Sequence, residues 1–303
     1  MFYFHDILYI LLFKNEYNLC LYTLNEHDHM VEIICNLSLK YQYDRKSPIM
    51  INPHIPGVIY ANLQINDNNT ITVISFDEGK HFLPIELEGN YSGCFDTSCC
   101  VEFYLELMIE SKEDHFPEKW MAIFQGVYHC NGSSRYHNFM TFNGGKTWRI
   151  LDRIIQKFFV LNHGGLVFAI EQSSNIIWYS YDEGNNWYDD IRGDFKDVFP
   201  LESHNNLGIS ALNVNRAYNI HSFNKYVFSS VISILCLMTD RTCHNDDYEP
   251  WYIPRFYENC FRGEEAFYWK IKRSAMCFDN RTVLIPTFEP CQCIRDGFQW
   301  YSN

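Results

Sequence analysis

Ser180-Tyr181-Asp182-Glu183-Gly184-Asn185-Asn186-Trp187 is one of three stretches with the pattern Ser/Thr-x-Asp/Asn-x-Gly-x-x-aromatic, known as the Asp-box. The others are Ser75–Phe82 and Thr141–Trp148. The pattern predicts a hairpin turn, because the Asp or Asn side chain can hydrogen-bond amides of its own turn and Gly accepts the positive φ where the chain reverses. The aromatic residue then packs the hairpin onto its neighbours. The positions given this structural role are Ser75, Asp77, Gly79, Phe82, Thr141, Asn143, Gly145, Trp148, Ser180, Asp182, Gly184 and Trp187.

The spacing of the boxes favours a β-propeller. Thr141 and Ser180 are 39 residues apart, close to one four-stranded blade of about 40–50 residues. Ser75 and Thr141 are 66 residues apart, so that interval carries an insertion. A decayed fourth copy, without the Gly and the aromatic, is predicted at 22–28, where Thr23 and Asn25 keep the first two positions.

Composition limits the function classes. The 303 residues are 47% hydrophobic and 17% aromatic, enough for a large core. The formal net charge of −13 argues against nucleic acid, since phosphate binding needs clustered Lys and Arg. The same charge gives solubility or an attraction for basic peptides.

Twelve cysteines and five N-x-Ser/Thr sequons predict an oxidising, glycosylating compartment, either the secretory lumen or the cell exterior. The glycosylation candidates are Asn36, Asn68, Asn90, Asn131 and Asn280. The apolar N-terminus 1–13 carries His5 and Asp6 and has no basic region or cleavage site, so it predicts strand, turn and strand rather than a signal peptide. The apolar stretch 227–238 is too short to cross a bilayer. We therefore expect the chain to be a fragment of a longer protein.

Short β-prone runs between turn signals dominate up to about residue 240. In 101–107, Val and Phe alternate with Glu and Tyr, which predicts a half-buried strand. The stretch 152–160 fits either a helical turn or a strand. Beyond residue 240, prolines and five cysteines replace the aliphatic runs, and so small a segment needs covalent links to stay folded. The predicted domains are a partial propeller, 1–240, and an incomplete cysteine-rich module, 241–303.

Disulfides are the predicted role of the clustered cysteines. The candidates are Cys94, Cys99, Cys20, Cys35, Cys243, Cys260, Cys277, Cys291 and Cys293. Cys94 and Cys99 fit a bridged hairpin loop, Cys20 and Cys35 face each other if their strands pair, and Cys100 is left for Cys130. Cys291 and Cys293 are too close to bond each other without strain, so each needs a distant partner. Zinc would need a CxxC or Cys/His set at regular spacing, which is absent, and we expect neither metal nor cofactor.

Catalysis has little support in the sequence. The twelve histidines, among them His27, His29 and His163, have no evident partner set and are interpreted as solvated or packed. Asp77 and Asp182 are committed to their turns. Asp-boxes also occur in sialidase-like glycoside hydrolases, which need convergent arginines with carboxylates or a Tyr nucleophile. The twelve arginines here are scattered, so the hydrolase is the alternative rather than the main hypothesis.

Taken together, these features resemble the sortilin-type receptors, the family with the vacuolar-protein-sorting-ten domain. The resemblance runs almost end to end and is most specific in 56–62 followed by 70–79, Cys94-x4-Cys99, Leu161–Ile170, Ser180–Trp187 and Cys243–Trp251.

That family implies a ten-bladed all-β propeller whose tunnel binds peptides and propeptides, two small cysteine modules, a membrane span and a sorting tail. This chain would cover roughly five blades and the first module, and would reach a membrane only through a downstream segment. The resemblance implies a non-enzymatic receptor that sorts or internalises propeptides, neuropeptide-like ligands or lysosomal cargo between Golgi, endosomes and cell surface, as part of a type I membrane protein. A secreted adhesion or decoy form is a third possibility.

Two departures from the family pattern stand out. Trp300 occupies the place of a sixth module cysteine, so one of the five lacks its usual partner unless Cys236 substitutes. Half a propeller would also leave sheet edges unpaired, so we expect the segment alone to bind ligand poorly. The resemblance carries no ligand-contact residue over to this chain.

Overall fold

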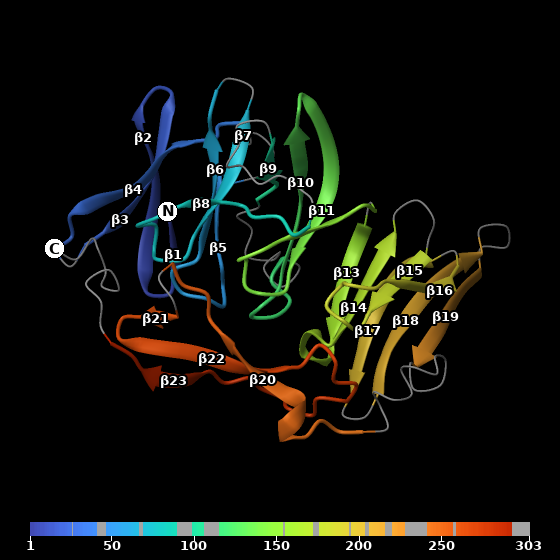
Figure 1. The fold of residues 1–303 in the computed structure, drawn as a ribbon. Helices are drawn as coiled ribbons and strands as arrows, with labels where there is room; N and C mark the ends of the chain where they lie inside the picture. Colours follow the sequence, from blue (N-terminus) through green and yellow to red (C-terminus); the bar gives the residue numbers. More distant parts are fainter. Residues whose placement is uncertain are drawn as a thin grey trace. The chain divides into compact units, whose positions relative to one another are not determined.

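The computed structural model of the 303-residue chain describes residues 1–25, 27–40, 47–66, 69–89, 99–105, 115–153, 155–171, 176–193, 195–203, 206–215, 220–227, 241–256 and 259–292. These residues are almost entirely strands and turns (Figure 1). No helix in this described part is long and apolar enough to span a membrane. The predicted all-β fold is confirmed.

The chain forms two compact units. Unit 1 comprises Met1–Asp152, Tyr252–Ala266 and Thr287–Asn303, and unit 2 comprises Arg153–Trp251 and Phe267–Pro286. Each unit therefore contains part of the cysteine-rich region 241–303. The division at residue 240 stays a prediction about the sequence.

The first eight strands of unit 1 make one sheet of two parts. Strands β1 (Phe2–Phe4), β2 (Ile7–Asn15), β3 (Asn18–Leu24) and β4 (Met30–Leu37) follow one another in the sheet, as do β5 (Ile49–Ile51), β6 (Ile59–Gln64), β7 (Thr70–Ser75) and β8 (Leu83–Pro84). The parts join where Leu37 of β4 pairs with Leu63 of β6 and where the Ser38 amide donates to the Asn62 carbonyl at 2.8 Å. We call them blades 1 and 2. The strand, turn and strand predicted for 1–13 are β1, the turn at His5–Asp6 and β2.

Blade 3 is a separate four-stranded sheet in unit 1. It contains β9 (Cys99–Phe103), β10 (Ala122–Cys130), β11 (Ser133–Thr141) and β12 (Arg149–Leu151), again in chain order (Figure 1). Val101 and Phe103 are buried, as the alternation predicts. Glu102, on the face expected to be solvated, is only 3% exposed because Lys40 and His129 cover it.

Unit 2 holds two further sheets. Blade 4 contains β13 (Ile155–Leu161), β14 (Leu166–Glu171), β15 (Ile176–Ser180) and β16 (Tyr188–Arg192), and blade 5 contains β17 (Phe195–Ser203), β18 (Asn206–Asn215) and β19 (Ile220–Val227). The ambiguous stretch at 152–160 is thus largely strand. All pairings within these blades are antiparallel between consecutive strands, which is the pattern of propeller blades.

The C-terminal region adds a small sheet of β20 (Tyr248–Tyr252), β22 (Glu264–Ile271) and β21 (Cys260–Phe261), with β23 (Thr287–Pro290) also paired to β22. The larger hydrophobic clusters lie in the blades, and a smaller one of Cys243, Ile271 and Cys277 lies in the cysteine-rich region. In unit 1, the rings of Phe103, Phe124 and Tyr60 surround Trp148, with centroids 4.7, 5.6 and 6.1 Å away. In unit 2, Phe168, Ile177 and Tyr179 are buried in one cluster. The closing aromatic of one Asp-box is therefore a central core residue of its unit.

Candidate functional site

The three Asp-boxes occupy the same place in three blades. Box 1 (Ser75–Phe82) connects β7 to β8, box 2 (Thr141–Trp148) connects β11 to β12, and box 3 (Ser180–Trp187) connects β15 to β16. Each is the turn between the third and fourth strands, and its first residue is the last residue of the third strand. The sequence repeat is therefore a repeat of position within a blade.

The polar side chains of each box bind within their own turn. In box 3, the Ser180 hydroxyl donates to Asp182 Oδ1 at 2.9 Å and accepts from the Gly184 amide at 2.8 Å. Asp182 Oδ1 also accepts from the Asn186 amide at 2.9 Å. The equivalent bonds are present in boxes 1 and 2 at 2.8–3.1 Å. These oxygens hold the turn together, so the box acids act as scaffold.

The boxes also use a bond that the pattern alone does not reveal. The indole N–H of Trp148 donates to the Gly145 carbonyl at 3.1 Å, and that of Trp187 donates to the Gly184 carbonyl at 3.1 Å. Phe82 of box 1 has no such donor and contributes only its ring, which packs against the core of blades 1 and 2. Tryptophan in the last position thus closes the turn as well as filling space.

The decayed copy at 22–28 lies at the corresponding turn of blade 1, between β3 and β4. Asn25 Oδ1 accepts from the His29 amide at 2.9 Å, the same four-residue relation as in the intact boxes. Thr23, however, donates its hydroxyl to the Leu8 carbonyl at 3.1 Å. This turn keeps the Asn bond of an Asp-box and has lost the Ser/Thr bond.

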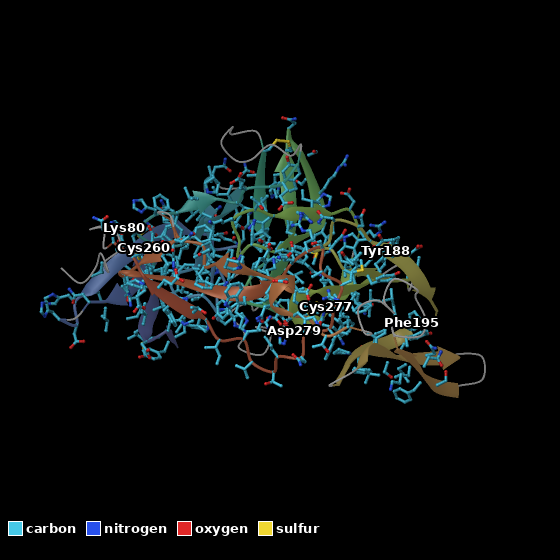
Figure 2. The ribbon with its side chains drawn as sticks, turned by 60° about the horizontal axis from the view of Figure 1, so that its bottom comes forward. Lys80, Tyr188, Phe195, Cys260, Cys277 and Asp279 are labelled. Atoms are coloured by element: carbon cyan, nitrogen blue, oxygen red, sulfur yellow. A yellow bond between two sulfur atoms is a disulfide. The ribbon has the colours of Figure 1, made fainter. Side chains whose placement is uncertain are left out.

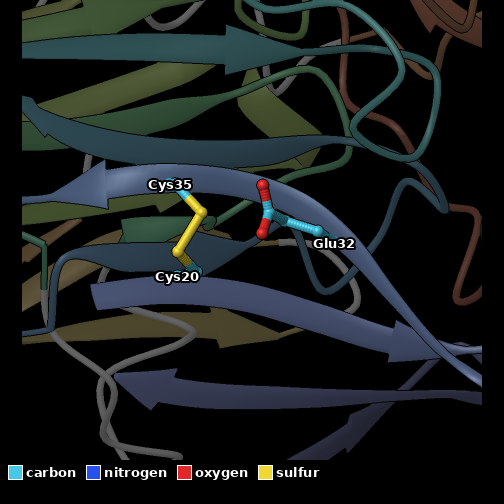
Figure 3. Close-up of side chains that lie close together, drawn as sticks. All are labelled: Cys20, Glu32 and Cys35. Carbon is cyan, nitrogen blue, oxygen red and sulfur yellow. A yellow bond between two sulfur atoms is a disulfide. The ribbon is translucent and has the colours of Figure 1, made fainter. Parts of the chain in front are cut away.

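A disulfide joins Cys20 of β3 to Cys35 of β4 across the blade 1 hairpin, the pair expected to face each other (Figure 3). The Glu32 carboxylate lies beside it, and the ligand atoms of the three side chains lie within 4.8 Å of one another, close enough to hold a metal ion. Both sulfurs are used by the disulfide, and Glu32 accepts from Lys14 at 2.8 Å and from Tyr22 at 3.2 Å. The cluster is accounted for as a cross-strand link.

The second disulfide corrects two expectations. Cys99 bonds to Cys130, not to Cys94, and Cys130 is not left for Cys100. The register of the β9–β10 pair explains this, because Cys99 lies directly opposite Cys130 whereas Cys100 lies opposite His129. Cys94 is outside the described residues.

Two disulfides lie within the cysteine-rich region. Cys243 bonds to Cys277, and Cys260 bonds to Cys291, with separations of 34 and 31 residues. Cys291 therefore reaches a distant partner, as its closeness to Cys293 requires. Cys293 and Cys236 are outside the described residues. Both bridges close loops inside the region, and neither links it covalently to a blade.

Three glycosylation candidates are described, Asn36, Asn131 and Asn280, and all three are exposed. Asn131 lies at the tip of the β10–β11 turn, with φ of 50°. Exposure makes these asparagines available to an oligosaccharide, and their modification stays a prediction. Asn68 and Asn90 lie outside the described residues.

His129 has a set of side-chain partners that the sequence did not reveal. His129 Nδ1 lies 2.8 Å from the Ser134 hydroxyl, and its Nε2 lies 3.3 Å from Glu102. Ser134 and His129 are directly opposed on β11 and β10, so the arrangement is a cross-strand polar row. Lys40 lies 3.6 Å from the same Glu102 carboxylate and offsets its charge. We interpret the row as cross-strand pairing on an antiparallel sheet.

Five of the described arginines pair with separate carboxylates. Arg149 pairs with Glu88, Arg241 with Asp247, Arg262 with Glu78, Arg273 with Glu183, and Arg281 with Asp279. The Arg241 guanidinium, with help from the His244 amide, lowers the pKa of Asp247 to about 2. Pairs of this kind are structural and differ from the convergent arginines that a sialidase-like site requires.

Asn162 binds the cysteine-rich region within unit 2. This residue is 1% exposed, in the short 3-10 turn that follows β13. Its side-chain amide donates to the Cys277 carbonyl at 3.0 Å and accepts from the Asp279 amide at 2.8 Å, and Figure 2 labels both partners. The neighbouring His163 ring lies 2.7 Å from the Arg281 carbonyl. The stretch Leu161–Ile170 was singled out only for its family resemblance, and the sequence gave no signal of this contact.

Successive antiparallel blades with an Asp-box at the third turn, followed by a disulfide-linked region, define an Asp-box propeller segment with a cysteine-rich extension. The family profile described as Sortilin, neurotensin receptor 3 matches residues 52–191, and the profile of its C-terminal part matches residues 227–301. The chain belongs to the sortilin family.

Curated relatives agree with this assignment. Vacuolar protein sorting/targeting protein 10 of Paracoccidioides lutzii is 24% identical over 274 residues, covering 81% of this chain and 17% of that protein. The human VPS10 domain-containing receptor SorCS1 is 24% identical over 265 residues, covering 80% of this chain and 22% of the receptor. The chain thus spans about a fifth of the length of these relatives.

Solved structures give weaker similarity. The Niastella koreensis GH74 enzyme aligns with a TM-score of 0.32 and 9% identity, covering 74% of this chain and 35% of the enzyme. A putative 6-phosphogluconolactonase from Bacteroides uniformis aligns with a TM-score of 0.24 and 9% identity, covering 92% of this chain and 84% of that protein. Scores this low support no argument about fold or activity.

Proposed function

We propose that this chain is a luminal, non-enzymatic, ligand-binding segment of a sorting receptor. The observation that carries the proposal is the order of the two family matches along the chain, first over the blades and then over the disulfide-linked region. The relatives are described by their names as a sorting and targeting protein and as a receptor. The proposed receptor captures peptides or proteins and carries them between Golgi, endosomes and cell surface.

The covalent chemistry supports the proposed compartment. Four disulfides require an oxidising environment in which to form and persist. The exposed sequons at Asn36, Asn131 and Asn280 suit the same secretory route.

The division of labour between scaffold and binding surface follows from the boxes. Their acids and hydroxyls are engaged in turn hydrogen bonds, so ligand contacts are proposed for the inner surfaces and other loops of the blades. The net charge of −13 favours basic segments among propeptides, neuropeptide-like ligands and lysosomal cargo.

A peptide-binding assay tests this function. The 303-residue chain, secreted with its disulfides intact, is captured and exposed to an array of propeptide-derived basic peptides and their scrambled acidic counterparts. Because the isolated segment is expected to bind poorly, we expect weak but saturable, salt-sensitive binding of basic peptides that is lost when the chain is reduced and alkylated. Equal binding by the reduced chain, or turnover of fluorogenic sialosides, would argue against a receptor segment and for the hydrolase.

A further inference from the structure

The fourth position of the Asp-box has a feature that the turn itself does not need. Glu78 in box 1 and Glu183 in box 3 occupy this position with left-handed φ values of 60° and 58°. Box 2 has Gly144 there, with φ of 73°, and forms the same turn hydrogen bonds. A glutamate in the left-handed region costs about 1 kcal/mol or more relative to glycine. Some other interaction must offset that cost in boxes 1 and 3.

Both carboxylates are also buried, which adds to the cost. Glu78 is 3% exposed and Glu183 is 8% exposed. Buried carboxylates are tolerated when they are paired with cations and hydrogen-bonded. In both boxes the cations come from the cysteine-rich region.

In unit 1, Glu78 receives the turn between β21 and β22. Arg262, in that turn, lies 2.5 Å from Glu78 Oε1. The His81 ring of the same box stacks on Phe256, with centroids 4.2 Å apart and planes 8° apart. In Figure 2, Lys80 marks the box and Cys260 marks the region that contacts it.

In unit 2, Glu183 receives the end of β22 and the residues that follow. Arg273 donates to Glu183 Oε2 through Nε at 3.0 Å and Nη2 at 2.7 Å. Lys270, itself 7% exposed, pairs with Oε1. Burial lowers the pKa of Lys270, and the Glu183 carboxylate opposes that effect.

We propose that Glu78 and Glu183 are docking sites on the blades for the cysteine-rich region. Because Cys243–Cys277 and Cys260–Cys291 close loops only within that region, these contacts secure it where the disulfides do not. An acidic fourth position marks a box that receives the region, and a glycine marks a box that acts as a turn alone. Glu78, Glu183 and Lys270 are buried, whereas the Arg262 and Arg273 side chains are 43% and 51% exposed. The pairs add little net stability but fix which surfaces meet, because an unpaired glutamate or Lys270 would be a buried charge.

Substitution by glycine distinguishes a docking role from a turn role, because the two roles predict opposite effects of the substitution: a turn role predicts equal or greater stability, and a docking role predicts loss of protection in the cysteine-rich region. If these residues serve only the turn, Glu78→Gly and Glu183→Gly are neutral or stabilising, because glycine suits the left-handed φ. Docking predicts about tenfold faster amide hydrogen exchange at 259–266 for Glu78→Gly and at 267–286 for Glu183→Gly, with the strands of the blades unchanged. The matched control is Asp28→Gly, an exposed acid with φ of 59° in the corresponding turn of blade 1.

Variants on the other side of each contact keep the test decisive if a glycine variant fails to fold. Arg262→Gln and Arg273→Gln leave the boxes intact and should speed exchange in the same segments as the matching glycine variant. The proposal is overturned if the cysteine-rich segments keep wild-type exchange in the glycine variants. It is also overturned if the arginine variants lose protection throughout the blades, because the pairs would then stabilise the blades rather than the docked region.

Discussion

At the scale of single residues, the box glycines carry a steric requirement. Gly79 has φ of 86°, and a Cβ built on it would lie 2.3 Å from Ile33 Cγ2. Gly89 has nearly the same φ, 85°, but a Cβ there would meet no atom of the described residues within 4 Å. An alanine would therefore suffer the same backbone strain at both positions, but only at Gly79 would it also clash with Ile33.

Gly79→Ala should destabilise the fold by about 2–4 kcal/mol, combining left-handed strain with overpacking. Gly89→Ala should cost about 1 kcal/mol, from strain alone. Urea unfolding followed by tryptophan fluorescence gives both values. Equal losses would show that Ile33 moves aside and that packing does not fix this glycine.

Tyr60 is a buried polar residue whose hydroxyl has no hydrogen-bond partner among the described residues. Its ring packs on Phe124 and Trp148, and burial raises the pKa of the phenol well above its usual range. Tyr60→Phe should raise the free energy of unfolding by about 1 kcal/mol, because an unsatisfied buried hydroxyl costs about that much. A clear loss of stability in thermal unfolding would mean that an ordered water binds the hydroxyl.

Residue-level predictability was uneven for physical reasons. The turn role of Asp182 could be predicted because its partners lie within four residues in the sequence. The partner of Cys130 could not, since a shift of one residue in strand register exchanges Cys99 for Cys100. The contact of Asn162 with Cys277 spans 115 residues, and no local pattern encodes it.

At the scale of elements, each Asp-box needs one oxygen in its third position. Asp182 Oδ1 and Asn143 Oδ1 accept the equivalent amide bonds at 2.9 and 3.0 Å. Asp182→Ala should therefore cost about 1–2 kcal/mol, whereas Asp182→Asn should stay within about 0.5 kcal/mol of wild type. Chemical denaturation of the two variants checks the difference. Equal losses would indicate that the negative charge, rather than the acceptor, supports this turn.

Strands were predictable where period and turn signals agreed. The N-terminal hairpin followed from apolar runs interrupted by His5 and Asp6, and the boxes located the third turn of three blades. The strand at Ile155–Leu161 was ambiguous because apolar residues occupy both of its faces, so neither a two-residue nor a 3.6-residue period stands out. Burial of Glu102 was missed because Lys40, in the turn after β4, and His129, on β10, reach it from other parts of the chain.

At the scale of the whole molecule, stability should fall with mild acid through His54. Burial lowers the pKa of His54 below its ordinary value of 6.5, and its Nε2 lies 2.8 Å from the Phe116 carbonyl. As pH falls, the unfolded chain therefore takes up the His54 proton before the folded chain does. The contribution of neutral His54 to the free energy of unfolding is fully present above pH 6.5 and is lost as pH falls toward the lower, folded-state pKa.

The comparison that isolates this effect is between wild type and His54→Gln at pH 7.5 and 5.5. The urea midpoint of wild type should fall more than that of the variant, since the variant lacks the titrating ring. Equal decreases in midpoint would assign the acid sensitivity to other groups.

The fold class and family could be predicted because the boxes repeat a local structure that survives at 24% identity. Ligand contacts could not be predicted, because the identity of binding residues in loops depends on the ligand and is not determined by the fold. The docking role of Glu78 could not be predicted either, because its sequence position indicates only a turn and its partner Arg262 is distant along the chain.

The proposed receptor role depends on the folding and function of this segment in the secretory lumen. Its most direct test is mass spectrometry of the endogenous protein, digested without reduction, before and after treatment with an N-glycosidase. We expect peptides joined through Cys20–Cys35 and Cys99–Cys130, and glycans on exposed sequons such as Asn131. Reduced cysteines and unmodified asparagines throughout would contradict it and place the protein outside the secretory pathway.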